Sequence, residues 1–302
     1  MVVFVHAIVA PGQGAQTPGF LAPWLELPIV ADRLAAWSEI VGIDLVAHGT
    51  TADADRIRDT AVAQPLLVAA ALAAAAALDV TPGVVAGHSV GEFAAAAIAG
   101  VLTDEEALAL VRERGHAMAK AAAVTATGMT AVLGGDEAEV LAALERHGLT
   151  PANVNGAGQI VAGGTLEQLD ALKADPPAKA RLRPLAVAGA FHTAHMAPAI
   201  DHLRGAAAEI TPKDPSVPLL SNADGAAVPS GADALARLVG QVGNPVRWDA
   251  CMATMAGMGV TTLVELLPGG TLTGLAKRAM PGVKTVAIKT PEDLDTAREA
   301  LR

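Results

Sequence analysis

The feature that most constrains the fold is the segment GVVAGHSVGE at residues 83–92. Its first five residues form a short apolar run bounded by turn-forming residues, which is typical of a strand buried on both faces of a parallel sheet. The alanine-rich segment after residue 91 favours a helix. Between them, Gly87-His88-Ser89-Val90-Gly91 fits G-x-S-x-G, the sharp strand-to-helix turn of a nucleophile elbow. The segment therefore predicts an α/β protein with a serine at the end of a strand.

Ser89 in such a turn has two interpretations. The flanking glycines permit a sharp turn, and the start of the next helix offers backbone N–H groups to developing negative charge. A serine in this position can also be an ordinary N-cap residue. The strand–turn–helix context favours the nucleophile, so we interpret Ser89 as a nucleophile that requires a base.

The remaining pattern predicts a large domain interrupted by a smaller one. Residues 1–125 and 190–302 alternate buried strands with helices, which predicts an α/β domain with a mainly parallel sheet. Residues 126–189 follow the order strand, helix, strand, strand, helix, strand, which is ferredoxin-like. The cleft between the two parts is the expected ligand site. The strands of the large domain are predicted at residues 2–10, 83–87, 217–220, 261–266 and 284–288.

Composition and charge disfavour several classes of function. With 52% hydrophobic and 17% charged residues, the chain has ample material for a core. The net charge of −10 disfavours binding to nucleic acids or to anionic membranes, which attract positive surfaces. Residues 66–78, between Pro65 and Asp79, number thirteen, whereas a membrane span needs about 20, so we interpret them as a buried helix. The N-terminus lacks the basic residues of a signal peptide. The single cysteine fits a reducing compartment, and we expect a cytoplasmic monomer.

Among the eight histidines, His192 is the best-placed base. It follows a predicted strand within GAFHTAHM, at the point where the chain returns to the large domain. His88 adjoins the serine, so its side chain should point away from that of Ser89. His195 forms an HxxH pair with His192, but no third ligand is nearby, and we expect no metal site.

The glycine-rich turn PGQGAQ at residues 11–16 could supply an oxyanion donor. It follows the first predicted strand, and the strands of a parallel sheet end at one edge. The alternatives are a plain tight turn or a phosphate loop. Because it lacks both G-x-G-x-x-G and the Walker lysine, nucleotide binding is not expected.

Six motifs occur in order along the chain: PGQGAQ (11–16), GHSVGE (87–92), RERGHAM (112–118), NVNGAGQIV (153–161), GAFHTAHM (189–196) and NPVRW (244–248). LLPGGTLTGLAKR (266–278) adds a seventh feature. Each motif is modest alone, but together they resemble the malonyl-CoA:acyl carrier protein transacylase family. The resemblance covers nearly the whole chain. It implies a hydrolase-like α/β core with a mainly parallel sheet and an inserted ferredoxin-like α+β subdomain.

The resemblance also implies roles for individual residues. Ser89 would be the nucleophile and His192 the general base, and the backbone amides of Gln13 and Val90 would form the oxyanion hole. Arg114 would bind the free carboxylate of the malonyl group, because a guanidinium grips a carboxylate through two parallel hydrogen bonds. Without the resemblance, Arg114 would be interpreted as a surface charge on an amphipathic helix.

Four further residues receive supporting roles from the same resemblance. The backbone carbonyl of Gln241 would orient the histidine, which gives a Ser–His dyad with a carbonyl in the place of the usual aspartate. Asn155 would lie in the pocket near the histidine, and His88 would line the pocket. Phe191 would fill the space that an α-methyl group needs, which favours malonyl over methylmalonyl units.

The implied reaction moves a malonyl group from malonyl-CoA to the phosphopantetheine thiol of acyl carrier protein in fatty-acid biosynthesis. It would proceed by a ping-pong route through a malonyl-serine. Malonyl-CoA is a substrate, and no permanently bound cofactor is expected. Acyl carrier proteins are acidic, so docking on this acidic chain requires a local basic patch. The candidates are Lys179, Arg181 and Arg183, or Lys277 and Arg278; scattered solvated charges are the alternative.

Three other functions stay open at this point. A malonyl acyltransferase of a polyketide pathway would show the same motifs. A serine esterase or thioesterase predicts the order Ser…Asp…His and an HGGG-type loop, neither of which is evident. A noncatalytic protein on the same fold predicts the loss of Ser89, His192 or Arg114, and all three are present.

Overall fold

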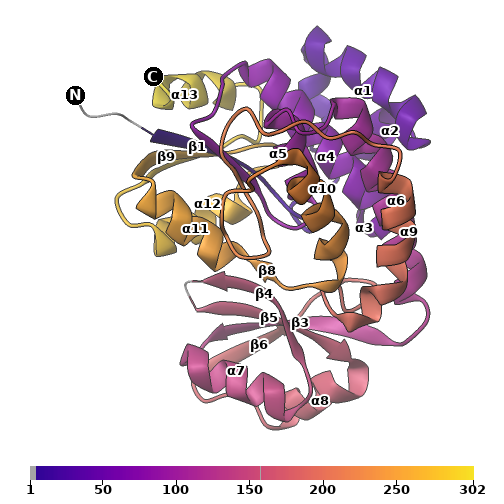
Figure 1. The fold of residues 1–302 in the computed structure, drawn as a ribbon, viewed down its shortest axis with the longest axis vertical. Coiled ribbons are helices and arrows are strands. Elements are labelled where there is room, and N and C mark those ends of the chain that lie inside the picture. Colours follow the sequence, from indigo (N-terminus) through magenta and orange to yellow (C-terminus); the bar gives the residue numbers. More distant parts are fainter. Residues whose placement is uncertain (1–4, 157) are drawn as a thin grey trace.

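Two sheets of five strands each organise the chain in the computed structural model (Figure 1). The structure describes residues 5–156 and 158–302. The first sheet is parallel, in the order β10-β9-β1-β2-β7. Its strands coincide with the five predicted ones; residues 2–4 of the first prediction lie outside the described residues. They are β1 (Val5–Ala10), β2 (Val84–Gly87), β7 (Leu219–Leu220), β9 (Val260–Glu265) and β10 (Lys284–Ala287).

Both faces of the first sheet are covered, so alternate residues of a strand enter different cores. Ile8 and Ala10 pack into one core, whereas Ala7 and Val9 pack into the other. This explains why these strands are apolar almost throughout. The first core contains residues of α1 (Pro28–Val41), α4 (Thr60–Leu78), α5 (Gly91–Ile98), α6 (Asp104–Ala122), α9 (Ala197–Ala207), α10 (Gly231–Gly240) and α13 (Asp293–Ala300). The second contains residues of α11 (Trp248–Gly257) and α12 (Thr271–Ala279).

The second sheet has the order β6-β3-β5-β4-β8. Its first four strands pair antiparallel, as a ferredoxin-like unit requires, and β8 adds to β4 in parallel. In Figure 1 the helices α7 (Glu137–Arg146) and α8 (Leu166–Ala174) cover its outer face. On the other side, Met129, Ala131 and Val161 join the core of the larger part. The predicted fold class is thereby confirmed. The elements are β3 (Thr127–Gly134), α7 (Glu137–Arg146), β4 (Thr150–Gly156), β5 (Gln159–Thr165), α8 (Leu166–Ala174), β6 (Ala180–Pro184) and β8 (Val246–Arg247).

Helix α4 corrects one argument made from the sequence. It has 19 residues and contains Pro65, so the thirteen residues after that proline are only part of the helix, and the argument from their number was wrong. By length and composition the helix could cross a membrane, but 83% of its most apolar window is buried inside the protein. Burial, rather than shortness, identifies α4 as a core helix.

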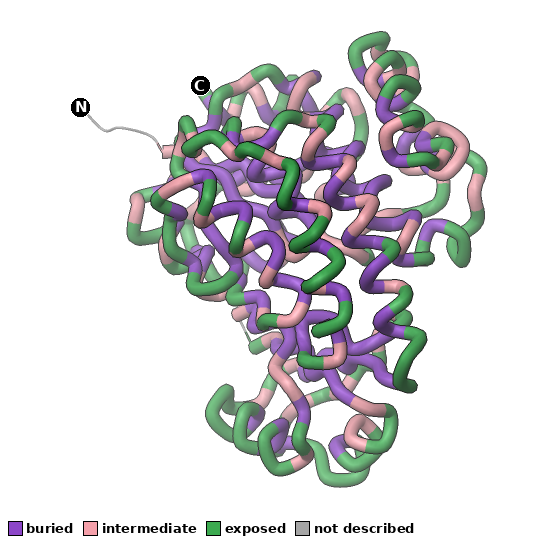
Figure 2. The backbone as a smooth tube through the Cα atoms, turned by 45° about the vertical axis from the view of Figure 1, so that its right-hand side comes forward, coloured by how far each residue is buried: buried purple, intermediate pink, exposed green. Residues whose placement is uncertain are grey.

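Most of the elements that the sequence pattern does not predict are short; the helix α13, with eight residues, is also missed. Five or six residues make too few turns to show helical periodicity, and the two residues of β8 are ordered by pairing with a distant strand. In Figure 2 the buried backbone concentrates in the larger part and at its junction with the second sheet. The remaining elements are α2 (Leu45–Thr50), α3 (Ala54–Arg58) and the 3-10 helices η1 (Ala22–Glu26), η2 (Ala194–Met196) and η3 (Gln241–Gly243).

Candidate active site

Ser89 stands on the tight turn that joins β2 to α5. Its φ of 53° lies in the left-handed region, which is strained for a residue with a side chain. A Cβ atom at Gly87 would lie 2.0 Å from the backbone carbon of Gly91, and one at Gly91 would lie 2.3 Å from the carbonyl oxygen of Ala10. Both positions therefore require glycine, and close backbone packing explains the G-x-S-x-G spacing.

His192 approaches the serine from the segment between β6 and η2. Its Nε2 atom lies 2.7 Å from Ser89 Oγ, and its Nδ1 atom lies 2.9 Å from the carbonyl oxygen of Gln241. A carbonyl can only accept, so the proton is on Nδ1 and Nε2 is free to accept the serine proton. Burial, with the nearby cation of Arg114, lowers the pKa of His192 to about 3. The imidazole is therefore neutral at physiological pH and can act as a base.

Arg114 projects from α6 into the interior beside the serine. The residue is 1% exposed. Its Nη1 donates to Gln64 Oε1 at 2.6 Å, and its Nη2 donates to Gln241 Oε1 at 2.7 Å and lies 3.4 Å from Ser89 Oγ. Burial lowers the pKa of Arg114 to about 9, which still leaves a cation at neutral pH. The structure thus holds a buried positive charge next to the nucleophile.

The Gln241 side chain links the arginine to the elbow. Its Nε2 donates to the backbone carbonyl of Ser89 at 2.9 Å and also to Glu92 Oε2. The same residue holds His192 through its backbone carbonyl. Gln241 therefore contacts the base, the elbow and the buried cation at once.

Three residues of this network were not identified from the sequence. Asn222 accepts from the Ser89 amide and donates to the carbonyl of Gly87, both at 2.7 Å, and its own amide donates to Glu92 Oε1 at 2.6 Å. Burial raises the pKa of Glu92 to about 7. The sequence could have pointed to two of them, because Glu92 ends the motif GHSVGE and Gln64 is a polar amide within an apolar helix. No sequence pattern pointed to Asn222, which follows a two-residue strand.

The serine opens into a cleft of about 250 Å³ between the two sheets, lined by both parts of the chain. His88 lines the cleft; its Nε2 lies 2.8 Å from Asn155 Oδ1, and its ring meets that of Trp248 edge-on at 5.6 Å. Burial lowers the pKa of His88. Asn155 thus contacts His88 rather than His192. The other predicted site residues that line the cleft are Gln13, Ser89, Arg114, Phe191 and His192.

Two backbone amides near the serine are free to bind a ligand oxygen. Val90 follows Ser89 directly and precedes α5, and Gln13 lies in the glycine-rich turn after β1. Across residues 5–156 and 158–302, neither amide donates to another backbone carbonyl. Both satisfy the first requirement of an oxyanion donor, an unused N–H group.

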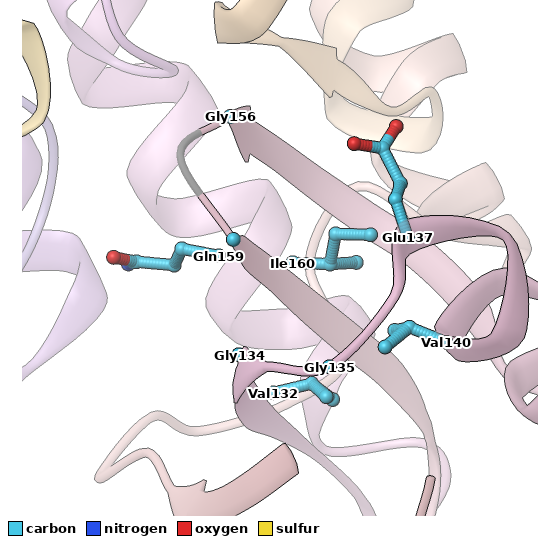
Figure 3. Close-up of a pocket in the computed structure, with 9 residues that line it drawn as sticks. Val132, Gly134, Gly135, Glu137, Val140, Gly156, Gln159 and Ile160 are labelled. Carbon is cyan, nitrogen blue, oxygen red and sulfur yellow. The ribbon is translucent and has the colours of Figure 1, made fainter. Parts of the chain in front are cut away.

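A second, much smaller cavity lies within the second sheet and does not include the serine. It opens beside Gly134, Gly135 and the start of α7, near Glu137 and Val140 (Figure 3). Gln159 borders both this cavity and the cleft, and in Figure 3 its side chain points away from Glu137 and Val140. The cleft at Ser89, rather than this cavity, holds the chemically active groups.

These groups suit covalent acyl chemistry. A serine hydroxyl faces a neutral imidazole, and a buried cation lies 3.4 Å from that hydroxyl; a hydroxyl paired with a base is the arrangement of a serine nucleophile. No group of three or more potential metal ligands occurs among the described residues.

Comparison with known proteins agrees with this chemistry. The family model described as the acyl transferase domain matches residues 7–292. The chain belongs to this acyl transferase family. A relative from Mycobacterium tuberculosis, described as malonyl CoA-acyl carrier protein transacylase, is 57% identical over 295 residues, covering 96% of this chain and 98% of the relative. The family resemblance inferred from the motifs is therefore confirmed.

Solved structures of acyl transferases share the whole fold. The crystal structure of MCAT from Mycobacterium tuberculosis matches with a TM-score of 0.94 at 55% identity, covering 97% of this chain and 99% of that one. A type II PKS acyl-carrier protein in complex with its malonyl-transacylase matches with a TM-score of 0.92 at 33% identity, covering 98% and 99%.

Proposed function

We propose that this protein transfers the malonyl group of malonyl-CoA to the phosphopantetheine thiol of an acyl carrier protein. The observation that carries the proposal is the pairing of Ser89 with His192 at 2.7 Å, with the Arg114 guanidinium 3.4 Å from the same hydroxyl. The pair supplies the nucleophile and the base, and the guanidinium supplies a partner for a free carboxylate. The names of the relatives support the same reaction.

The first half-reaction loads the serine. His192 Nε2 takes the hydroxyl proton as Ser89 Oγ attacks the thioester carbonyl, and the amides of Gln13 and Val90 stabilise the oxyanion. The C–S bond breaks, and the CoA thiolate leaves with the proton from His192. The imidazolium is held by the Gln241 carbonyl while it exists.

The second half-reaction repeats these steps with a different thiol. The phosphopantetheine thiol gives its proton to His192 and attacks the malonyl-serine carbonyl. The bond to Ser89 Oγ then breaks, and the imidazolium returns its proton to that oxygen. Arg114 holds the malonyl carboxylate throughout, which fixes the ester in one pose and keeps a water molecule from the line of attack. Phe191 lines the cleft, and we expect its ring to fill the space that an α-methyl group would need.

Mass spectrometry of the acyl-enzyme tests the proposal directly. Mixed with malonyl-CoA, the protein should gain one malonyl group on the peptide that contains Ser89, and added holo acyl carrier protein should remove it. Ser89→Ala should gain none. An unmodified serine would contradict the proposal, and rapid release of malonate without carrier protein would favour a hydrolase instead.

Docking of the carrier protein should depend on basic residues beside the cleft. Arg181 and Arg183 lie exposed on β6, just before the cleft residue Leu185, with Lys179 immediately before the strand. Lys277 and Arg278 lie exposed at the end of α12. Reversing the charge of the patch that docks should raise the KM for the acidic carrier protein about tenfold at low salt, and much less at high salt.

The control for this docking prediction is Lys173→Glu on the outer helix α8. It makes the same change of charge on an exposed residue that does not border the cleft. An unchanged KM after reversal of both patches would contradict docking at this face. Comparing carrier proteins of fatty-acid and polyketide origin in the same assay would separate the two pathways, since one matched structure holds a type II PKS acyl-carrier protein in complex with its malonyl-transacylase.

A further inference from the structure

The transfer steps leave the buried carboxylate of Glu92 without a role. This residue lies at the start of α5 and is 5% exposed. An ionised carboxylate can only accept hydrogen bonds. Its two oxygens accept from two groups far away in the sequence: the backbone amide of Asn222 and the Nε2 of Gln241. Glu92 is therefore built into the site rather than solvated.

The contact with Glu92 restricts how the Gln241 amide can be oriented. An amide can exchange its oxygen and nitrogen by a half-turn of the side chain. Here the Ser89 carbonyl can only accept, the Glu92 oxygen accepts from the Gln241 Nε2, and the Arg114 guanidinium can only donate. Only one orientation satisfies all three, because the reverse one would place an NH₂ group against the guanidinium.

The Arg114 guanidinium has few other restraints. Apart from its 3.4 Å contact with Ser89 Oγ, its protein partners within the described residues are the side-chain oxygens of Gln64 and Gln241, and its buried Nε has none. Loss of the Gln241 oxygen would therefore remove one of its two short hydrogen bonds. The position of the guanidinium depends on which end of the Gln241 amide faces it.

We propose that Glu92 is a positioning residue that acts through Gln241 to hold Arg114 beside Ser89, and that it thereby sets the preference for acyl groups with a free carboxylate. The inference rests on the proposed function, because it concerns recognition of the malonyl carboxylate. Glu92 touches neither the substrate nor the reacting atoms. Its effect should fall on the selectivity between acyl groups rather than on the chemistry of the serine.

Glu92→Gln tests the inference, because it keeps the shape of the side chain. One end of the new amide can still accept from Asn222, but the other end then presents a donor to the donor of Gln241. Relief of that conflict moves the Gln241 amide away from position 92, which draws its oxygen out of hydrogen-bond distance of Arg114. We expect acylation of Ser89 by malonyl-CoA to slow about ten- to a hundredfold, the size of a lost charged hydrogen bond. Acylation by acetyl-CoA, which carries no carboxylate, should change by less than about threefold.

Labelling of Ser89 by a sulfonyl fluoride separates positioning from a general structural role. This reagent needs the serine and the base but no carboxylate contact, so its rate with Glu92→Gln should stay near that of the wild type. Equal losses for malonyl-CoA, acetyl-CoA and the sulfonyl fluoride would overturn the inference. So would an unchanged ratio of malonyl to acetyl rates.

A double-mutant cycle tests whether Glu92 acts through Gln241. Gln241→Met removes the amide at similar length, so it should also lower the ratio of malonyl to acetyl rates. Adding Glu92→Gln to it should lower the ratio no further. The inference would be overturned if the two substitutions lowered the ratio of malonyl to acetyl rates additively. It would also be overturned if Gln241→Met kept the wild-type ratio, and this second test does not require Glu92→Gln to fold.

Failure of this inference can be told apart from failure of the proposed function. A wild-type protein that forms no malonyl-serine, or that prefers acetyl-CoA, contradicts the proposed function. A wild-type protein that prefers malonyl-CoA, together with a Glu92→Gln variant that keeps this preference, contradicts only the role of Glu92.

Discussion

Replacement of Arg114 by methionine is expected to slow malonylation of Ser89 by about 30-fold to a few thousandfold, because truncating one partner of a buried charge pair costs about 2–5 kcal/mol. The substrate carboxylate would then enter a buried site without a counter-charge. Acetyl-CoA loses no such partner, so its rate should change far less. Methionine keeps much of the side-chain volume in the space beside Phe93, whose ring centroid lies 5.6 Å from the guanidinium carbon. The ratio of the two acylation rates, measured by quenched-flow mass spectrometry, is the decisive quantity.

Arg114→Lys serves as the matched control for charge. Lysine keeps the positive charge but lacks the planar fork that binds a carboxylate at two points, so an intermediate preference is expected. Because the Arg114 cation helps to lower the pKa of His192, the methionine variant should also have a more easily protonated base. A methionine variant that keeps the full malonyl preference would refute the carboxylate-binding role.

Replacement of His192 by alanine is expected to slow acylation by about 10²–10⁴-fold, the range that a positioned general base contributes. Ser89 Oγ would lose the acceptor that lies 2.7 Å away. Unlike the arginine variant, this one should lose activity toward malonyl-CoA and acetyl-CoA equally. Pre-steady-state acylation of both substrates would measure the effect.

The pH profile gives a further check on His192. Burial lowers its pKa to about 3, so the neutral base is present at all pH values above that, and acid should not protonate it near its usual value of 6.5. Sulfonyl fluoride labelling of the wild type should therefore stay nearly level from pH 8 down to pH 5, a window of about three units. A loss of rate centred near pH 6.5 would show that the base is not desolvated as the structure indicates.

His195→Ala is the control for the His192 variant. It removes the second histidine of the HTAH segment, which is only partly buried and does not border the cleft. We expect it to keep wild-type acylation. A loss as large as that of His192→Ala would mean that the segment as a whole, rather than one imidazole, supports the reaction.

Local sequence patterns predicted most of the secondary structure. A strand buried on both faces of its sheet appears as a continuous apolar run, and in an amphipathic helix the apolar residues recur about every four positions. These patterns did not predict β8, whose two residues become a strand only by pairing with Asn153 and Val154 of β4. The argument that counted only the residues after Pro65 also failed, because that proline lies within the early turns of α4 and does not end it.

The candidate site also contains features that the local sequence predicts and features that it does not. The glycine spacing around Ser89 is a local matter, because the steric conflicts that it avoids lie within the elbow and the adjacent strand. His192 was proposed as the base from its position after a predicted strand and again from the family resemblance, whereas the role of Arg114 came from the resemblance alone. Neither source indicated their burial, and without that resemblance Arg114 had been assigned to a solvated helix face.

The sequence by itself determined an α/β protein with a serine on a sharp turn, since glycine, apolar runs and helical periodicity act over a few neighbouring residues. Only the tertiary structure decided which buried groups surround that serine and which hydrogen bonds hold them. Gln241 reaches Arg114 across 127 residues of sequence and Glu92 across 149, and desolvation by the assembled core sets the pKa of both Glu92 and His192. Hydrogen bonds between distant segments and loss of solvent exist only after the chain has packed, so no local pattern can encode them.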